Sequence, residues 1–556
     1  MEPANSVSQA ERVDVIVIGA GFAGLYAHYG LRERGLSACG FEEAGDVGGT
    51  WYWNRYPGAR VDIESLQYCF HFSPEIREEW FWSERFASQP ELLRYFNYVA
   101  DRFDLRRDIT FNARVVSAVY SDEENLWTVE TDKGDIARGT YCILGTGLLS
   151  APYQPPFPGA EDFKGEWYHS SRWPYETVDL SGKRVGVIGT GSTGIQIVQT
   201  IASKVGHLTV FQRTANYATP GINKRLTREE QRAFNARHDG WMKEVSSLFN
   251  GQTGAFPAPT KSALEDMPEE RRELLEDRWT NGGHPQTLLA AYNDINDDLE
   301  SNEILCEFVR GKIRSIVKDP ATAKLLCPKG HPIGAKRVPL DFGYFEAFNR
   351  DNVTLVDVKS NPIERITAAG VRTSGAGYEL DVIIFATGFD AITGAISAID
   401  IRRDDGPSLK DLWAEGPKNY LGVMIAGLPN LFIVNGPGSG GIKANNVLGV
   451  EHGIEWALRC LDRLNAEGFD RIEADQQAQE GWVALCQQVA EASLVSKAGS
   501  WYTGANIPGK HQSYMPYFGG WNHYIEICED SITNGYRGFH LSRSCAAPGK
   551  PTIAAQ

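Results

Sequence analysis

The chain lacks several features that would assign it to a common protein class. Its nine cysteines are scattered over 556 residues, without a C-x-x-C pair and without a cysteine–histidine cluster at zinc spacing, so we expect no metal site. An odd, scattered cysteine set in a long chain is typical of a reduced protein rather than of a disulfide framework. No run of about 20 apolar residues occurs, and we therefore expect no membrane-spanning helix.

Positive charge is also scarce. Lysine and arginine number 55 against 71 aspartates and glutamates, and the net charge of −16 disfavours binding to the phosphate backbone of nucleic acids. The first 15 residues have no basic segment followed by an apolar core, so we expect no signal peptide and a cytoplasmic location. At about 100–200 residues per domain, the length suggests about three domains.

A glycine motif near the start of the chain follows an apolar segment. Residues 13–18, VDVIVI, are typical of a strand buried on both faces. Gly19, Gly21 and Gly24 then form G-x-G-x-x-G at the start of a helix-like segment, and Glu42 follows 18 residues after Gly24. Such glycines let the backbone approach a pyrophosphate at a helix N-terminus, and the acid binds ribose hydroxyls. The segment predicts a dinucleotide site.

The same pattern recurs after residues 184–188. Gly189, Gly191 and Gly194 form the second G-x-G-x-x-G, but Arg213 and Thr214 stand where an acid would lie. Arginine attracts a 2′-phosphate that a carboxylate would repel, so this site favours NADPH. The alternative is that Arg213 is a solvated residue at the end of a strand.

Two dinucleotide sites in one chain indicate a flavin and its reductant, FAD and NADPH. We therefore expect an α/β fold with two Rossmann-like dinucleotide-binding domains. The segment DVGGTWYWNRYPGARVDIES (46–65) supports a flavin, because Trp51, Tyr52 and Trp53 offer flat apolar surface beside an isoalloxazine. An aromatic loop packed in a core is the alternative, but residues 54–65 of the segment also carry four charged residues, too many for an ordinary core. They are Arg55, Arg60, Asp62 and Glu64.

Two further segments, 141–147 and 381–390, are strand-like. The first ends in Gly-Thr-Gly, and the second carries Ala-Thr-Gly two residues before its end. In two-dinucleotide oxidoreductases such segments mark chain crossings between the domains. The expected division is an FAD domain at 1–148 and 386–541, an NADP domain at 149–220 and 331–385, a helical insertion at 221–330 and a poorly ordered tail at 542–556.

Between the first crossing and the second glycine motif lies FKGEWYHSSRWP (163–174), which shows no clear strand or helix period. It matches F-x-G-x-x-x-H-x-x-x-W-P through Phe163, Gly165, His169, Trp173 and Pro174. With GGTWYWNRYPGARVDIES and SWYTGANIPGK (500–510), the chain resembles the type I Baeyer–Villiger monooxygenases, in the phenylacetone and steroid monooxygenase branch. The resemblance extends from residue 13 to about 541.

This resemblance implies a reaction. A ketone would be converted to an ester or lactone with NADPH and O2, through a C4a-peroxyflavin. The family's catalytic cation falls on Arg337 and its acid on Asp62; from the sequence alone, a surface arginine and a helix-capping or loop acid are the alternatives. Trp501 would close over the nicotinamide and exclude water. His169 would couple the two domains, and the 163–174 segment would act as a rigid aromatic connector between them.

The resemblance also places the cofactors. FAD would contact Gly19, Gly21, Phe22, Ala23, Gly24, Glu42, Gly49, Thr50, Trp51, Asp62, Tyr68, Val115 and Asn446. NADP would contact Arg60, Gly189, Gly191, Ser192, Thr193, Gly194, Gln196, Arg213, Thr214, Lys336, Arg337 and Trp501. In this set Lys336, Arg213 and Thr214 would bind the 2′-phosphate.

The sequence departs from the family pattern after GPGS. Here Gly440 and Gly441 are expected to loosen a turn, and Lys443 and Asn446 put polar groups where relatives have apolar ones. Asn446 replaces a flavin-contacting methionine, which puts that contact in doubt. Lys443 points either to solvent or into the pocket, where it would favour a polar or acidic ketone.

Three other functions are compatible with parts of the sequence. A heteroatom monooxygenase, acting on sulfides or amines, is the alternative that shares both cofactors. A disulfide reductase would need a redox cysteine pair, but the cysteines nearest the flavin loop, Cys39 and Cys69, are 30 residues apart. A flavoprotein sensor without catalytic activity would need neither the NADPH arginine nor the complete 163–174 motif.

Overall fold

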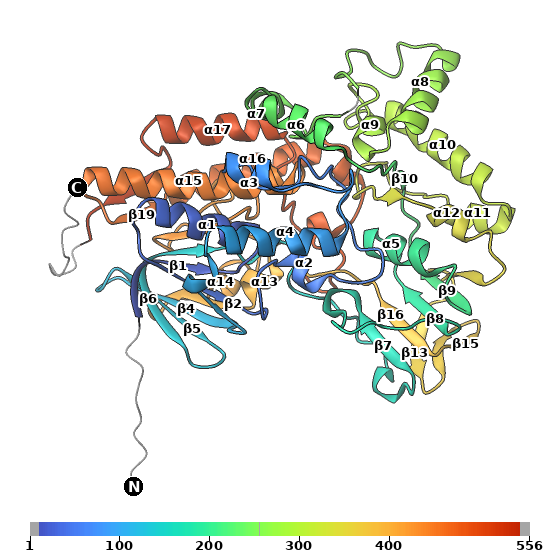
Figure 1. Cartoon of the computed structure of the whole chain (residues 1–556), viewed down its shortest axis with the longest axis horizontal. Helices are drawn as coiled ribbons and strands as arrows, with labels where there is room; N and C mark the ends of the chain where they lie inside the picture. Colours follow the sequence, from blue (N-terminus) through green and yellow to red (C-terminus); the bar gives the residue numbers. More distant parts are fainter. Residues whose placement is uncertain (1–10, 255, 545–556) are drawn as a thin grey trace, which may run out of the picture.

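The computed structural model describes residues 11–254 and 256–544, and within them two sheets dominate (Figure 1). The larger sheet has eight strands in the order β17-β4-β5-β6-β1-β2-β3, with β18 also pairing with β6. Strand β1 is parallel to β2 and β6, whereas β5 is antiparallel to both of its neighbours. The strands are β1 (Glu11–Ile18), β2 (Ala38–Glu42), β3 (Ile109–Phe111), β4 (Val115–Ser121), β5 (Leu126–Thr131), β6 (Ile136–Leu144), β17 (Asp400–Arg403) and β18 (Leu431–Ile433).

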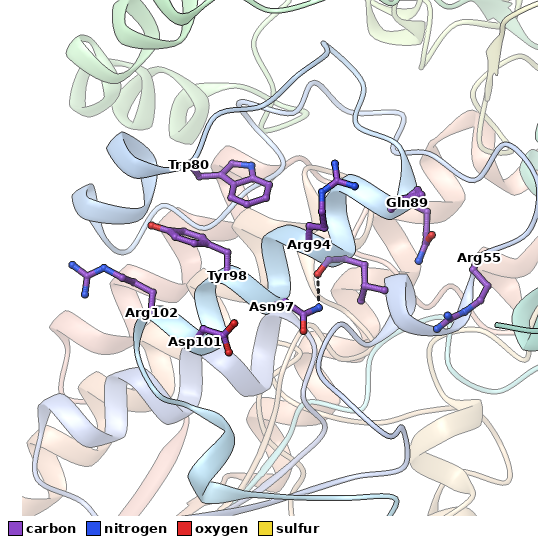
Figure 2. A pocket seen from close by; sticks show the side chains of 10 residues that line it. Arg55, Trp80, Gln89, Arg94, Asn97, Tyr98, Asp101 and Arg102 are labelled. Carbon is purple, nitrogen blue, oxygen red and sulfur yellow. Dashed lines mark hydrogen bonds between the residues drawn. The ribbon is translucent and has the colours of Figure 1, made fainter. Parts of the chain in front are cut away.

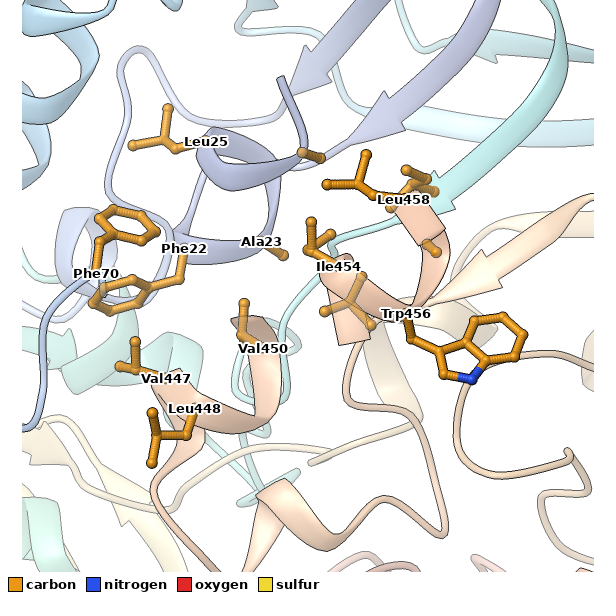
Figure 3. Close-up of a cluster of buried hydrophobic side chains, with 14 of the residues drawn as sticks. Phe22, Ala23, Leu25, Phe70, Val447, Leu448, Val450, Ile454, Trp456 and Leu458 are labelled. Carbon is orange, nitrogen blue, oxygen red and sulfur yellow. The ribbon is translucent and has the colours of Figure 1, made fainter. Parts of the chain in front are cut away.

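Helices from both ends of the chain cover this sheet. Helix α1 (Phe22–Glu33) packs against α15 (Asn446–Glu467) so closely that a Cβ added to Gly30 would lie 2.3 Å from a Leu458 methyl carbon. Figure 3 shows Phe22 and Phe70 facing Val447 and Val450 across this contact. Other helices of this half are α2 (Thr50–Trp53), α3 (Pro74–Glu79), α4 (Gln89–Arg102), α13 (Gly394–Ser397), α14 (Leu409–Leu412), α16 (Gln476–Ala492) and α17 (Trp521–Thr533).

The second sheet is built from residues 166–385, so its last strand lies within the second predicted crossing, 381–390. Its five strands are all parallel, in the order β12-β9-β8-β16-β7. Buried residues alternate along β16, so that Val382 and Ile384 face one core and Ile383 and Phe385 the other. The strands are β7 (Glu166–His169), β8 (Arg184–Ile188), β9 (His207–Gln212), β12 (Val353–Asp357) and β16 (Val382–Phe385).

The 163–174 segment belongs to this second sheet, which corrects the expectation of a connector without regular structure. Strand β7 is an edge strand that pairs with β16, and the turn Ser170–Arg172 follows it. Phe163 is buried in the core on one face of the sheet and Trp173 in the core on the other. The aromatic residues thus anchor the segment to one domain. A Cβ on Gly165 would lie 2.3 Å from the Asp381 carbonyl oxygen, which explains the glycine.

The helices of residues 221–330 divide between the two halves of the molecule. Helix α7 packs against α17, whereas α10 packs against α12 beside the second sheet (Figure 1). The helices of this segment are α6 (Arg228–Ala236), α7 (His238–Ser247), α8 (Pro268–Asn281), α9 (Pro285–Leu289), α10 (Leu299–Ile316) and α11 (Pro320–Leu326). Two helices outside it, α5 (Ser192–Ile201) and α12 (Tyr344–Ala347), pack against each other beside the second sheet. The inserted segment therefore contacts both halves of the molecule.

Small sheets complete the fold. Two are pairs, β10 (Thr219–Pro220) with β11 (Leu340–Asp341) and β19 (Arg471–Ala474) with β20 (Phe539–Ser542). A third small sheet has three strands, β13 (Ile363–Thr367), β14 (Gly370–Thr373) and β15 (Gly377–Glu379). Most of the expected tail lies outside the described residues; Ser542 ends β20, and Ser544 donates to Asp470. Across residues 11–254 and 256–544, no helix combines the length and apolar character needed to cross a membrane.

Candidate functional site

The two glycine motifs form matching turns at the starts of α1 and α5. Each helix begins after a glycine, Gly21 or Gly191, and neither glycine position has a side-chain cap among the described residues. The first N–H groups of a helix have no partner within the helix. Together with the helix dipole they attract an anion, so both turns can hold a pyrophosphate.

The space around the glycines fits a bound dinucleotide. A Cβ on Gly24 would lie 1.8 Å from the Gly19 carbonyl oxygen, and one on Gly194 would lie 2.1 Å from that of Gly189. The third glycine of each motif is therefore required by close backbone packing. In contrast, a Cβ on Gly191 would meet no described heavy atom within 4 Å. That open side is where a pyrophosphate can approach the backbone.

The two strand ends differ in charge. Glu42 is buried, and its carboxylate accepts the Ala20 N–H at 2.6 Å and the Ala44 N–H at 2.7 Å; burial raises the pKa of this carboxyl. Arg213 and Thr214 are exposed at the corresponding end of β9. Burial, aided by the charge of Arg213, lowers the pKa of Lys336. Neither cation has an ion-pair partner in the described parts of the chain, and the two together suit a phosphate group.

Arg337 and Asp62 form a bidentate ion pair, although they are 275 residues apart. Arg337 Nε donates to Asp62 Oδ2 at 2.8 Å and Nη2 donates to Oδ1 at 2.5 Å. The charge of Asp62 raises the pKa of Arg337, although the guanidinium is partly withdrawn from solvent. Burial opposes ionisation of Asp62, but the charge and hydrogen bonds of Arg337 hold its pKa below the usual range. Both groups are therefore charged at neutral pH.

The aromatic loop after the first motif packs inward behind this pair. Trp51 is buried, its Nε1 donates to the Tyr68 hydroxyl at 3.3 Å, and its carbonyl accepts from Gln89 Nε2 at 2.6 Å. Burial raises the pKa of Tyr68 to about 12, so it stays a neutral hydroxyl. Thr50 and Trp51 begin the short helix α2 after Gly49, which has φ 52°.

Two residues expected at NADP contribute to the contact between the two halves. Gln196 on α5 donates from Nε2 to the Arg60 carbonyl at 3.0 Å and accepts from the Tyr56 hydroxyl at 2.9 Å. Arg60 lies 3.3 Å from Glu84 and donates to the Phe86 carbonyl. These side chains join the flavin-side loop to the helix of the second motif.

His169 lies where the two predicted crossings meet. Its Nδ1 is 2.7 Å from Ser171 Oγ, while Nε2 is 3.2 Å from the Tyr153 carbonyl oxygen and 3.3 Å from Thr387 Oγ1. Thr387 also donates to the same Tyr153 oxygen at 2.6 Å. Burial lowers the pKa of His169, which favours the neutral ring. These contacts link β7 to Tyr153 and Thr387, and the coupling of the domains by His169 stays a prediction.

The loop that carries Trp501 is fastened to the second crossing. Trp501 begins a single 3₁₀ turn and packs on Tyr502 with ring centroids 4.1 Å apart. Further along the loop, Asn506 Nδ2 donates to the Phe389 carbonyl at 2.8 Å, and Lys510 pairs with Asp390 and donates to Thr393 Oγ1 at 2.7 Å. The loop position thus depends on the segment that links the domains.

The remaining predicted residues lie at defined places. Phe22 and Ala23 open α1, Ser192 and Thr193 open α5, and Val115 is buried with Phe41 in the core beneath the first sheet. Asn446 begins α15, and its Oδ1 accepts from Asn435 Nδ2 at 2.7 Å, so the amide has a protein partner where the family has a methionine.

Sequence reasoning missed Tyr502, Phe518, Asn506 and Lys510. Each carries no motif of its own, although three of them lie within or next to the SWYTGANIPGK segment. It also gave no sign of a cavity of about 960 Å³ along α4, lined by Arg55, Trp80, Gln89, Leu93, Arg94 and Tyr98 among others (Figure 2). None of the predicted cofactor or catalytic residues lines this cavity, so it is separate from the site around Arg337.

Comparison with known proteins agrees with this geometry. Residues 16–244 match the family model described as pyridine nucleotide-disulphide oxidoreductase. A Baeyer–Villiger monooxygenase from Pseudooceanicola batsensis is 42% identical over 536 residues, covering 96% of each chain. A phenazine N-monooxygenase from Lysobacter antibioticus is 38% identical and covers 95% of this chain and 97% of its own.

A solved structure of oxidized steroid monooxygenase bound to NADP has a TM-score of 0.90 and 45% identity, covering 96% of this chain and 100% of its own. The disulfide reductase alternative finds no support at the flavin loop, because burial raises the pKa of the Cys69 thiol, whereas redox cysteines have lowered pKa values. With its two nucleotide folds, its Arg337–Asp62 pair and relatives at this identity, the chain belongs to the FAD- and NADP-dependent Baeyer–Villiger monooxygenases.

Proposed function

We propose that this chain inserts one atom of O2 beside the carbonyl of a ketone, giving an ester or lactone with consumption of NADPH. The observation that carries the proposal is the bidentate Arg337–Asp62 pair, which joins the loop after the first glycine motif to the loop after the helical insertion. When bound, FAD would supply the activation of O2 with electrons from NADPH. All other steps depend on residues of the chain.

The division of the chain follows from this proposal. Residues 1–148 and 386–541 would hold FAD, with Gly21 at its pyrophosphate and Glu42 at its ribose. Residues 149–220 and 331–385 would hold NADPH, with Gly191 at the pyrophosphate. The unpaired cations Arg213 and Lys336 would bind the 2′-phosphate, in keeping with the lowered pKa of Lys336.

Arg337 would stabilise negative charge on the reacting oxygen. Its Nε and Nη2 are fixed by Asp62, whereas Nη1 makes no hydrogen bond to any described residue. The side chain remains 36% exposed, so part of the guanidinium faces space that a ligand can occupy. A fixed cation of this kind stabilises developing charge without reorganising, because its orientation is set before the reaction. Asp62 positions it.

The test is product analysis with NADPH, O2 and a panel of ketones. We expect the wild type to form esters or lactones and Arg337→Ala to lose about 10²–10³-fold in their rate of formation, the usual cost of one electrostatic group. Flavin content should be retained, whereas the KM for NADPH can rise because Arg337 is also expected at the NADP site. Wild-type ester formation by Arg337→Ala would refute the proposal.

A matched control is Arg403→Ala. Arg403 also pairs through Nε and Nη2 with one aspartate, Asp122, but at the edge of the first sheet. This variant should keep full activity.

Formation of S-oxides or N-oxides without ester from any ketone would instead support the heteroatom alternative, the reaction class of the N-monooxygenase relative.

A further inference from the structure

Lys443 extends from the turn Gly440–Ile442 into the region around Arg337. The side chain is half-buried, and its Nζ donates to the Gly334 carbonyl at 3.4 Å. The same Nζ lies 4.8 Å from the Tyr502 ring centroid and 5.8 Å from that of Phe518. Of the two alternatives raised by the sequence, the structure therefore favours the inward one.

The turn that carries Lys443 is held tightly rather than loosened by its glycines. A Cβ on Gly440 would lie 2.7 Å from the Tyr524 ring, and one on Gly441 would lie 2.5 Å from the Gly449 Cα. Both glycines are buried, so the turn packs directly on α15 and α17. The backbone that presents Lys443 is thus fixed, which favours a defined direction for its side chain.

The neighbours of Lys443 belong to the two loops that form the proposed site. Gly334 lies three residues before Arg337, and Tyr502 follows Trp501. Tyr502 is close enough to Arg337 to influence its pKa electrostatically. The ammonium group therefore stands between the loop of the catalytic cation and the loop expected to cover the nicotinamide.

Lys443 has no charge partner. Among the described residues no carboxylate oxygen lies within 4.0 Å of its Nζ, whereas Arg337 has Asp62. Holding a half-buried cation without an anion costs free energy, because the carbonyl and aromatic contacts replace only part of its hydration. Arg213 and Lys336 already provide positive charge for the 2′-phosphate. An anionic group on a ligand other than NADPH would give Lys443 the ion-pair partner that it lacks.

We propose that Lys443 binds the carboxylate of the substrate, so that the enzyme prefers ketones that carry a carboxylate over neutral ketones of the same skeleton. This inference rests on the proposed function, since it assigns the substrate class of that site. Lysine suits the role as a point charge on a flexible stem, which tolerates several positions of the carboxylate.

The experiment compares 4-oxo-4-phenylbutanoate with its methyl ester, which differ only in charge and one methyl group. The kcat/KM of both is measured for the wild type, Lys443→Met and Lys443→Arg. We expect Lys443→Met to lower kcat/KM for the acid about 10- to 100-fold, the range of a hydrogen bond to a charged group, and to leave the methyl ester within about twofold. Lys443→Arg should keep the preference for the acid.

Calorimetric binding of both compounds to the enzyme loaded with FAD and NADP⁺ provides a readout without turnover. If the wild type binds the acid more tightly than the methyl ester and Lys443→Met loses this difference, the inference is supported. This holds even if no ester product is formed, and in that case only the proposed function fails. Equal binding of acid and methyl ester by the wild type overturns it. A raised KM for NADPH in Lys443→Met, with equal losses for both ketones, also overturns it and assigns the charge to the cofactor.

Discussion

In the first nucleotide motif the strand after the helix ends in the buried Glu42, whereas in the second the exposed Arg213 follows the matching strand. The turns themselves are nearly identical. A Cβ on Gly19 would lie 2.4 Å from the Gly145 carbonyl oxygen, and one on Gly189 would lie 2.4 Å from that of Ala386. The cradle is thus a property of packed backbone, and the two sites differ in the charge of the side chain at the end of the strand.

The two motifs also differ in what faces their middle glycine. A Cβ on Gly21 would lie 3.5 Å from the Cα of Gly49, so the loop before α2 folds over the first turn. Gly191 faces no such loop within the described structure. A covered turn suits a resident cofactor and an open turn suits one that must enter and leave during each cycle.

The largest expected effect distinguishes two glycines of the second motif, Gly194 and Gly191. Gly194→Ala places a Cβ 2.1 Å from the Gly189 carbonyl oxygen, so we expect it to destabilise the protein by about 3 kcal/mol, the upper end of overpacking costs. Gly191→Ala meets open space and should leave the melting temperature unchanged while raising the KM for NADPH. Calorimetry and steady-state kinetics measure both. Equal melting temperatures for the two variants would contradict the close packing.

A smaller effect is expected from removing the positive charge of Arg213, which stands where the first motif has Glu42. Arg213→Ala should lower kcat/KM for NADPH about 10- to 100-fold, because a charge-assisted hydrogen bond to the 2′-phosphate contributes about 1.5–3 kcal/mol. The kcat/KM for NADH, which has no such phosphate, should change little. Arg350→Ala, which removes another exposed arginine from the same half, serves as the control. Parallel losses for both cofactors would show that Arg213 has a structural role instead.

The smallest effect is a pH dependence confined to the first motif. Burial raises the pKa of Glu42 above its value in the unfolded chain, so its contribution to stability is complete below the unfolded pKa. That contribution is lost as pH rises through the folded pKa, at about 1.4 kcal/mol per unit of pKa difference. The stability of the wild type minus that of Glu42→Gln should therefore fall as pH rises from about 4 to 7.

Denaturation of the FAD-free proteins over this pH range provides the measurement, because the ribose hydroxyls of bound FAD would also donate to this carboxylate. Arg213→Ala should show no comparable trend relative to the wild type, because Arg213 stays charged throughout. A difference between wild type and Glu42→Gln that does not vary with pH would contradict the raised pKa.

Local sequence patterns predicted the parts of the fold that depend on local interactions. The strand at 13–18 lies within β1, the one at 184–188 is β8, and both helices start at the expected glycines. Strand β7 could not be predicted, because its four residues form a strand only by pairing with β16, about 215 residues later in the chain.

The candidate site was less accessible to local reasoning. The Arg337–Asp62 pair spans 275 residues and followed only from the family resemblance. Gln196 is predicted at NADP, and the structure adds that its amide joins two parts of the protein, a contact that no local motif indicates. Gly440 and Gly441 were expected to loosen a turn, since sequence shows a missing side chain but not the neighbour that fills its place.

The contact of His169 with Tyr153 and Thr387 has a mechanical consequence. Because the chain enters the second half near Tyr153 and returns near Thr387, both connections pass through one hydrogen-bonded point. Any rotation of that half relative to the first would have its pivot there, and displacements would grow with distance from it. The second glycine turn lies beside this point, because a Cβ on Gly189 would come 2.4 Å from the Ala386 carbonyl oxygen. Such a rotation would therefore displace that turn less than the parts of the half that lie farther away.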